Sequence, residues 1–239
     1  SEESMGISNT DYDGMMKFVL WDLDLIKNEF PPQDIVYHYT KPESFRNIIQ
    51  SRQLRLTNVK DFEDKSEGKI IIPLFREICD ELLDDGEINK EQHRLLSSIE
   101  LDFKYAFFHF TGHINEYENY ERVETPCDMH VCCFCKNENS DYMWKNYCEK
   151  DTESGYNICV DLELISKEIA NPSFKCFVGS VCYDKDRMKD ILKRYVRHVS
   201  GFGDNMVSFV KNMLNRLSLF IKSEEYSSEE EIRMVLAVP

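Results

Sequence analysis

The 239-residue sequence lacks both an excess of positive charge and any long apolar run. It carries 29 Lys and Arg against 44 Asp and Glu, which gives a formal net charge of −15. Such a chain repels phosphates, so indiscriminate binding to DNA, RNA or an anionic membrane is excluded. No run of 18 apolar residues occurs, and no transmembrane helix is predicted. Aromatic residues make up 12% of the chain, more than disordered segments contain.

The signature motifs of several common enzyme folds are also missing. The sequence contains no GxGxxG, GxxxxGK[ST], HExxH or GxSxG pattern. Rossmann, P-loop, zincin and α/β-hydrolase interpretations therefore lose their main support. The first residues are polar and acidic, without the basic start and apolar centre of a secretory signal. We therefore expect a cytoplasmic protein with reduced thiols.

Nine cysteines are present, and several of them cluster in the middle of the chain with a histidine: Cys127, His130, Cys132, Cys133, Cys135 and Cys148. The spacing of Cys132 and Cys135 would suit a zinc knuckle. However, the segment MHVCCFC is typical of a strand, it contains no Gly or Pro, and no second C-x-x-C follows. We expect these thiols to pack as small buried hydrophobes without a metal. A zinc site and a catalytic thiol are the alternatives.

Helical and strand-like segments alternate irregularly along the chain. Apolar spacing predicts helices at about 14–29, 42–52, 68–84, 88–104, 140–150, 162–170 and 187–221, the last broken at residues 201–203. Strands are expected at 34–40, 54–57, 129–135, 156–161, 174–183 and the C-terminal EIRMVLAV. Residues 105–113 suit a strand or a helix end, and 115–124 a loop. Without a regular βαβ repeat, the order favours an α+β fold: a short-stranded mixed or antiparallel sheet core surrounded by several helices.

The same pattern predicts the domain organisation. Residues 1–33 are expected to form an N-terminal helical extension, and residues 34–239 a single α+β domain with helical insertions at about 68–104 and 187–221. Residues 184–222 hold nine Lys and Arg against four Asp, whereas the remainder holds 20 basic and 40 acidic residues. This basic segment could present a local anion site, or it could be a solvated helix face that pairs with acidic neighbours.

Three segments carry a family resemblance: YHYTKPESFRNIIQSRQLRLTNVKDFEDKSEG, CCFCKNENSDYMWKNYCEKDTESGYNICVDL and KSEEYSSEEEIRMV. Together they resemble the bacterial family catalogued as domain of unknown function 2971, over roughly residues 35–238. The chain departs from the family pattern at three places. Residues 63–65 are Glu-Asp-Lys in place of Asn-Asp-Pro, Tyr226 stands at the terminal Trp, and Cys135 replaces a Ser.

The arrangement of a first-strand H-x-T, a mid-chain Tyr and a late-strand Glu also resembles the His-Tyr-Glu type of ADP-ribosyltransferase. This second resemblance implies a split α+β fold that binds NAD and transfers ADP-ribose. It implies that His38 bonds a ribose hydroxyl, that Thr40 is the small hydroxyl residue two positions on, and that Tyr147 (or Tyr142) stacks on nicotinamide. Glu231 would be the catalytic carboxylate, with Glu229 two residues earlier.

The chemistry of these residue types fits the implied roles. Cleavage of the nicotinamide glycosidic bond develops an oxocarbenium ion, which a fixed carboxylate stabilises. An aromatic face holds a flat ring, and a neutral histidine orients a hydroxyl. Glu229, Glu231 and Arg233 would share one face of a strand. Trp144 and Tyr147 could form a ring platform or pack a helix on the core, His38 could be structural, and Glu231 could belong to a solvated charge run.

We therefore expect an ADP-ribosyltransferase-like protein or NAD glycohydrolase, acting as a bacterial toxin or defence effector. NAD would be the substrate, the partner would be a small nucleotide ligand, and no metal would be needed. The acceptor and the oligomeric state are left open. The alternative is a non-enzymatic interaction or regulatory module, in which no pocket would gather His38, Tyr147 and Glu231. Adjacent strands that place His38 and Glu231 in one cleft would favour the enzyme.

Overall fold

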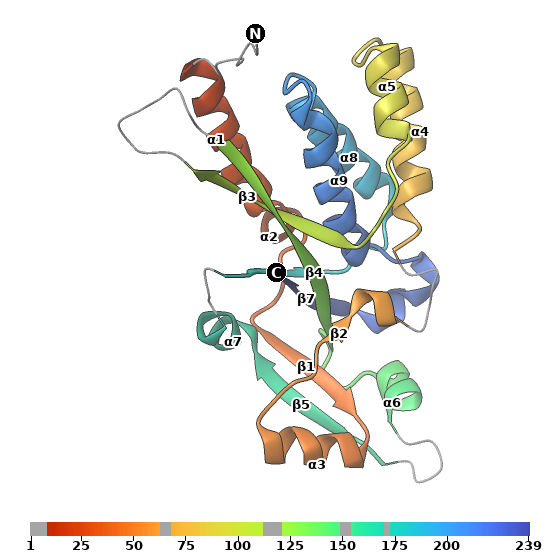
Figure 1. The fold of residues 1–239 in the computed structure, drawn as a ribbon. Helices are drawn as coiled ribbons and strands as arrows, with labels where there is room; N and C mark the ends of the chain where they lie inside the picture. Colours follow the sequence, from red (N-terminus) through yellow and green to blue (C-terminus); the bar gives the residue numbers. More distant parts are fainter. Residues whose placement is uncertain (1–8, 63–67, 112–120, 149–153, 170–172) are drawn as a thin grey trace.

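An antiparallel sheet of seven strands forms the centre of the molecule (Figure 1). The computed structural model describes residues 9–62, 68–111, 121–148, 154–169 and 173–239. The strand order is β5-β1-β4-β7-β6, and β2 and β3 also pair with β4. The strands are β1 (Ile35–Thr40), β2 (Thr57–Asn58), β3 (Lys104–Thr111), β4 (Glu121–Cys135), β5 (Tyr156–Asp161), β6 (Lys175–Ser180) and β7 (Glu231–Val238). With its helices, this sheet confirms the α+β class.

Strand β4 organises the sheet because four other strands pair with it. It spans 15 residues and has antiparallel ladders with β1, β2, β3 and β7. The expected strand at 129–135 is present, but it begins eight residues earlier, within the segment predicted as a loop. The ladder with β3, from Lys104 opposite Asp128 to Thr111 opposite Glu121, supplies the reason. Pairing between strands satisfies the backbone of a polar segment whose side chains gave no strand signal.

The helices lie in two groups around the sheet (Figure 1). One group packs with the upper part of the sheet: α1 (Asn9–Leu23), α2 (Leu25–Glu29), α4 (Ile71–Asp84), α5 (Lys90–Ser97), α8 (Lys185–Val199) and α9 (Asn205–Leu217). The other lies at the lower end: α3 (Pro42–Ser51), α6 (Asp141–Tyr147) and α7 (Leu162–Glu168). Three 3-10 turns are η1 (Val59–Asp61), η2 (Ser218–Phe220) and η3 (Glu224–Glu229). No helix in the described ranges is long and apolar enough to cross a membrane.

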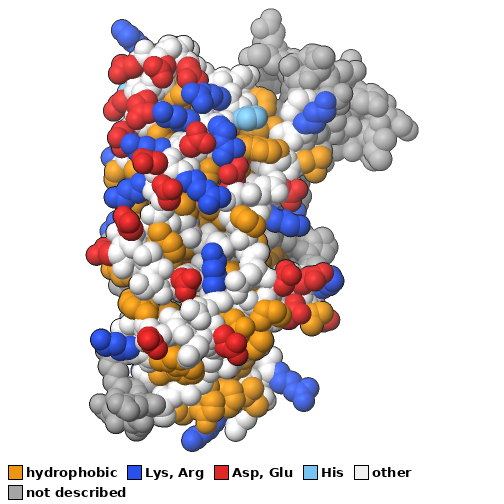
Figure 2. All heavy atoms as spheres, turned by 180° about the vertical axis from the view of Figure 1, so that it is seen from behind, with side chains coloured by type: hydrophobic (Ala, Val, Ile, Leu, Met, Phe, Trp, Pro, Cys, Tyr) orange, Lys and Arg blue, Asp and Glu red, His pale blue; other side chains and the backbone are white. Residues whose placement is uncertain are grey.

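The basic segment at 184–222 pairs with acidic neighbours from α2, from α4 and from the loop after α4. Lys189 of α8 lies 2.6 Å from Glu77 of α4, and Arg197 lies 2.5 Å from Glu87. Lys193 pairs with Glu81, and Arg194 pairs with Glu29, in the same way. Figure 2 shows Lys and Arg side chains interspersed with Asp and Glu over this part of the surface. These pairs favour the solvated helix face over the local anion site.

A buried ion pair joins α1 to α9. The Arg216 guanidinium is fully buried and donates to Asp22 at 2.6 and 3.3 Å. Its cationic centre also lies 5.1 Å from the ring centroid of Phe177 on β6. Phe18 and Leu25, from α1 and α2, belong to the main hydrophobic core. The first helices are therefore packed onto the sheet and its helical cover.

Removal of Asp22 should destabilise the fold strongly. Asp22→Ala leaves the buried Arg216 without its carboxylate, and breaking a buried ion pair costs about 3–5 kcal/mol of unfolding free energy. Urea denaturation of the parent and the variant measures this loss. Glu163→Ala is the matched control because its pair with Lys167 is exposed, and it should leave stability nearly unchanged. Equal stability of the two variants would contradict a structural role for the Asp22–Arg216 pair.

Candidate functional site

A split in the sheet opens next to the middle of β4. On one edge of β4, Val131 pairs with Thr57 of β2, and Cys135 pairs with Tyr37 of β1. Residues 132–134 between them have no strand partner on that edge among the described residues. Because β2 has two residues and β1 pairs with β4 at Cys135, the edge of β4 between these two contacts is open. Strand β7 pairs with the other edge of β4.

His38 lies at this split. Its Nδ1 atom is 3.2 Å from the backbone oxygen of Cys133. A carbonyl oxygen only accepts hydrogen bonds, so Nδ1 carries the proton and Nε2 keeps a lone pair. Burial lowers the pKa of His38, against a smaller opposing effect of this hydrogen bond. The ring is therefore neutral near pH 7 and offers Nε2 as an acceptor.

A cavity of about 900 Å³ lies at the split, within the range of roughly 300–1,000 Å³ that small-molecule sites occupy. His38, Tyr147, Glu229 and Glu231 all line it, although they come from four separate elements. The strands that carry His38 and Glu231 are not adjacent, because β4 lies between β1 and β7. The two residues nevertheless line one cavity beside the open edge of β4.

Two of the predicted ligand-binding residues do not line the cavity. Thr40 is buried near the end of β1, where it pairs with Tyr156 of β5. Trp144 packs edge-on against Tyr39, with ring centroids 4.8 Å apart, and its Nε1 donates to Asn139 at 2.9 Å. The structure thus places Trp144 in the packing of α6. Thr40 lies in the sheet near Gly155.

A buried ion cluster occupies one wall of the cavity. Arg233 donates from Nε to Glu231 Oε1 at 2.6 Å and from Nη2 to Oε2 at 3.2 Å. Lys222 Nζ lies 2.8 Å from the same carboxylate and 2.6 Å from Glu229 Oε2. Glu231 and Arg233 alternate on β7 and so share a face. Glu229 is not part of that strand, because Glu230 has a φ of 44° and ends η3 just before β7 begins.

The two carboxylates of this cluster differ in their proton affinity. Burial alone would raise the pKa of Glu231, but Arg233 and Lys222 outweigh it and lower the value to about 2. Burial raises the pKa of Glu229 above its ordinary value, against the lowering effect of Lys222. Glu231 is therefore held as an anion that is already bonded to two cations. Of the two carboxylates, Glu229 is the one that takes up a proton more readily.

Tyr147 links helix α6 to this wall. Its side chain is 43% exposed, and its hydroxyl donates to Glu229 Oε1 at 3.2 Å. Burial of the hydroxyl and the nearby Glu229 charge raise the pKa of Tyr147, which keeps the phenol protonated. Helix α6 is positioned by Ser140, whose backbone N–H donates to the Tyr39 hydroxyl at 2.9 Å. The Tyr147 ring is thus fixed at one end while part of its surface stays open to solvent.

The cysteines of β4 do not converge on one point. Cys132 and Cys135 lie three residues apart on a strand and so point to opposite faces. They belong to different hydrophobic clusters, and burial raises the pKa of Cys132 to about 12. Cys133 faces the cavity, where surrounding protein atoms and Glu231 raise its thiol pKa. No metal-binding group of three or more His, Cys, Asp or Glu is found in the described part of the chain.

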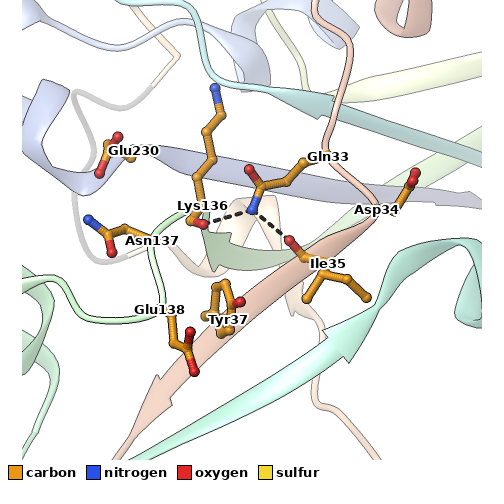
Figure 3. Close-up of a pocket in the computed structure, with 8 residues that line it drawn as sticks. All are labelled: Gln33, Asp34, Ile35, Tyr37, Lys136, Asn137, Glu138 and Glu230. Carbon is orange, nitrogen blue, oxygen red and sulfur yellow. Dashed lines mark hydrogen bonds between the residues drawn. The ribbon is translucent and has the colours of Figure 1, made fainter.

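A second, more open depression of about 630 Å³ shares Tyr37 with the cavity (Figure 3). Gln33 crosses it and donates to the backbone oxygens of Ile35 and Lys136 at 2.6 and 2.7 Å. The Lys136 side chain points away from Tyr37, and Glu138 and Glu230 lie at the rim. The residues that line this depression come from β1 and from the segments next to β1, β4 and β7. The cavity at the split, by contrast, gathers a neutral histidine, a tyrosine and paired carboxylates, and it is the candidate site.

Comparison with known proteins gives one match. A family model described as "Protein of unknown function (DUF2971)" matches residues 143–234. This supports the family resemblance over that part of the chain. No curated protein and no solved structure matches. The matched range contains Tyr147, Glu229, Glu231 and Arg233 of the candidate site, and it does not reach His38.

The residues that sequence reasoning missed are the cations of the cavity. Lys222 precedes Glu229 by seven residues, and only the path of η2 and η3 brings its ammonium group between the two carboxylates. Arg233 was recognised as sharing a face with Glu231, but nothing local indicated its bidentate bond. Arg55 gave no signal because it precedes a strand of two residues.

Replacement of Glu231 should reduce stability and change its dependence on pH. The folded-state pKa of about 2 lies below the ordinary value of 4.5, so the ionised carboxylate stabilises the fold above pH 4.5. That contribution is lost as the pH falls from about 4.5 toward 2. Glu231→Gln should therefore unfold about 3–5 kcal/mol more easily at pH 7, and its stability should fall less steeply than the parent's below pH 4.5. Urea denaturation at several pH values measures both effects.

The neighbouring Glu230→Gln is the matched control, because Glu230 is exposed at the surface. It should keep the parent's stability and its acid dependence. An unchanged pH dependence in Glu231→Gln would show that the ion cluster does not hold the wall of the cavity together.

Proposed function

We propose that the cavity binds NAD and that the protein cleaves its nicotinamide glycosidic bond, as a hydrolase or an ADP-ribosyltransferase. One observation carries the proposal: His38, Tyr147 and the pair Glu229 and Glu231 come from three distant parts of the sequence, yet all four residues line one cavity. The split of the sheet beside β4 adds support, since a split α+β fold is what the resemblance to ADP-ribosyltransferases implies.

The roles follow from the contacts. His38, neutral and with a free lone pair on Nε2, accepts a hydrogen bond from a ribose hydroxyl. The partly exposed ring of Tyr147 offers a face to the nicotinamide ring. The Glu229 carboxylate lies beside that ring, 3.2 Å from the Tyr147 hydroxyl. A ligand held by these three side chains has its ribose next to a negative charge.

The proposed reaction breaks one bond at ribose C1′ and forms one bond there. The bond between ribose C1′ and the nicotinamide nitrogen breaks, and its electron pair neutralises the positive charge of that nitrogen. Positive charge develops on the ribose and is stabilised by the nearby carboxylate. The oxygen of water, or of an acceptor, then bonds to C1′ and loses its proton. Glu229 takes that proton.

The ion cluster changes which carboxylate is expected to act. Glu231 has each of its oxygens bonded to a cation and a pKa near 2, so it is a poor proton acceptor. Glu229 has a raised pKa and lies next to Tyr147. We therefore assign proton transfer to Glu229. Glu231 binds Arg233 and positions Lys222, which lies 2.6 Å from Glu229.

Because both oxygens of Glu231 are already bonded to cations, a second candidate function is also favoured: a module that binds a nucleotide without cleaving it. In such a module the cavity and His38 keep their binding roles, while the ion cluster serves only to hold the wall. The two candidates differ in one observable, the consumption of NAD.

The decisive experiment follows NAD consumption and nicotinamide release by the purified protein, with and without cell lysate as a source of acceptors. The parent should consume NAD. Glu229→Gln should lower kcat by about 100-fold or more, within the range that general-base catalysis contributes. The parent's kcat/KM should rise with pH through the raised pKa of Glu229, because the deprotonated carboxylate is the active form, and this rise should disappear in Glu229→Gln.

Glu230→Gln again serves as the control and should retain full activity. Circular dichroism and urea denaturation confirm that Glu229→Gln is folded. If a folded parent protein consumes no NAD under any of these conditions, the catalytic proposal fails and the binding module is favoured. Activity that survives in Glu229→Gln would reject the role assigned to that residue.

A further inference from the structure

The cations that line the cavity differ in whether they already have a carboxylate partner. Lys222 and Arg233 lie within 2.8 Å of Glu229 or Glu231, and both are largely buried. Arg55 also lines the cavity, but it is exposed and forms no ion pair or hydrogen bond with any described side chain. Among the described residues that line the cavity, Arg55 is therefore the cation without a carboxylate partner.

Arg55 is placed across the split from the ion cluster. It lies two residues before Thr57, which pairs with Val131 of β4. On the other edge of β4, Cys133 pairs with Arg233 of β7. Arg55 and Arg233 therefore line the cavity from opposite edges of the same strand. A ligand lying over Cys133 would have the ion cluster on one side and the Arg55 guanidinium on the other.

We propose that Arg55 binds the phosphate groups of the ligand and thereby selects a nucleotide over the corresponding nucleoside. The inference rests on the proposed function in taking an ADP-ribosyl compound as the ligand. A guanidinium binds phosphate through two parallel charge-assisted hydrogen bonds. Asp61 also lines the cavity, and its carboxylate repels a phosphate placed beside it, whereas the Arg55 guanidinium attracts one. The phosphates therefore lie on the Arg55 side.

The test compares ligands with and without phosphate and does not require catalysis. Isothermal titration calorimetry measures the binding of ADP-ribose and of adenosine to the parent, Arg55→Gln, Arg55→Lys and Arg46→Gln. Arg46 is a matched control because it is an exposed arginine of α3 that does not line the cavity. Both Gln variants change the net charge equally.

The parent should bind ADP-ribose, and Arg55→Gln should weaken this binding by about 10- to 100-fold. Arg55→Lys should lie in between, because it keeps the charge and loses the paired hydrogen bonds. Arg46→Gln should bind ADP-ribose as the parent does. Adenosine should bind the parent and Arg55→Gln equally, and added salt should weaken ADP-ribose binding more than adenosine binding.

The outcomes separate this inference from the catalytic one. Dependence of ADP-ribose binding on Arg55 in a protein that consumes no NAD would support the phosphate site and reject the catalysis. NAD consumption with equal ADP-ribose binding in the parent and Arg55→Gln would reject the phosphate site alone. If Arg46→Gln weakened ADP-ribose binding as much as Arg55→Gln does, the loss would be an effect of net charge, and the phosphate site would be rejected. Absence of ADP-ribose binding to the parent would overturn the phosphate site, whereas NAD consumption alone decides the catalytic proposal.

Discussion

The bidentate bond between Glu231 and Arg233, completed by Lys222, is the interaction on which the candidate site depends. Burying these charges is tolerable only because each finds a partner within about 3 Å. The cluster ties β7 to the chain that precedes it: Arg233 also donates to the backbone oxygen of Leu219 in η2, and Lys222 bonds Glu229 at the end of η3. The same bonds decide the chemistry. They neutralise the charge of Glu231 and leave Glu229, two residues earlier, as the carboxylate with a raised pKa.

The cavity itself follows from how the strands end. Side chains alternate along β4, so a shift of one residue in its register with β7 would move Arg233 away from the side of Cys133. On its other edge β4 has two partners, β2 and β1, which pair with it on either side of residues 132–134. Neither strand covers those residues, so the backbone oxygen of Cys133 is left to another donor. His38 supplies it, which fixes the tautomer of the ring as well as its place at the split.

The fold was predictable where the signal was local. Six strands and the α+β class followed from alternation and from the irregular order of elements, and the break between α8 and α9 followed from its glycines. The first part of β4 was missed, because residues 121–128 form a strand only through their ladder with β3. In the site, the resemblance to ADP-ribosyltransferases pointed to His38, Tyr147, Glu229 and Glu231, and all four line the cavity. It could not show that Glu231 is already bonded to two cations or that Trp144 packs on Tyr39, since these contacts join residues brought together only by the fold.

The net charge of −15 and an anionic ligand are compatible because charge acts locally in this molecule. The cavity is lined by three cationic side chains, Arg55, Lys222 and Arg233, and by three carboxylates, those of Asp61, Glu229 and Glu231. Two members of each set are bonded to one another within the cluster, which leaves Arg55 and Asp61, among the described lining residues, as the charges that a ligand meets. Charges elsewhere on the surface are screened over about 8 Å at physiological salt. The acidic surface therefore excludes a polyanion, which would extend beyond the cavity, while a ligand with one pyrophosphate group experiences mainly the field of Arg55.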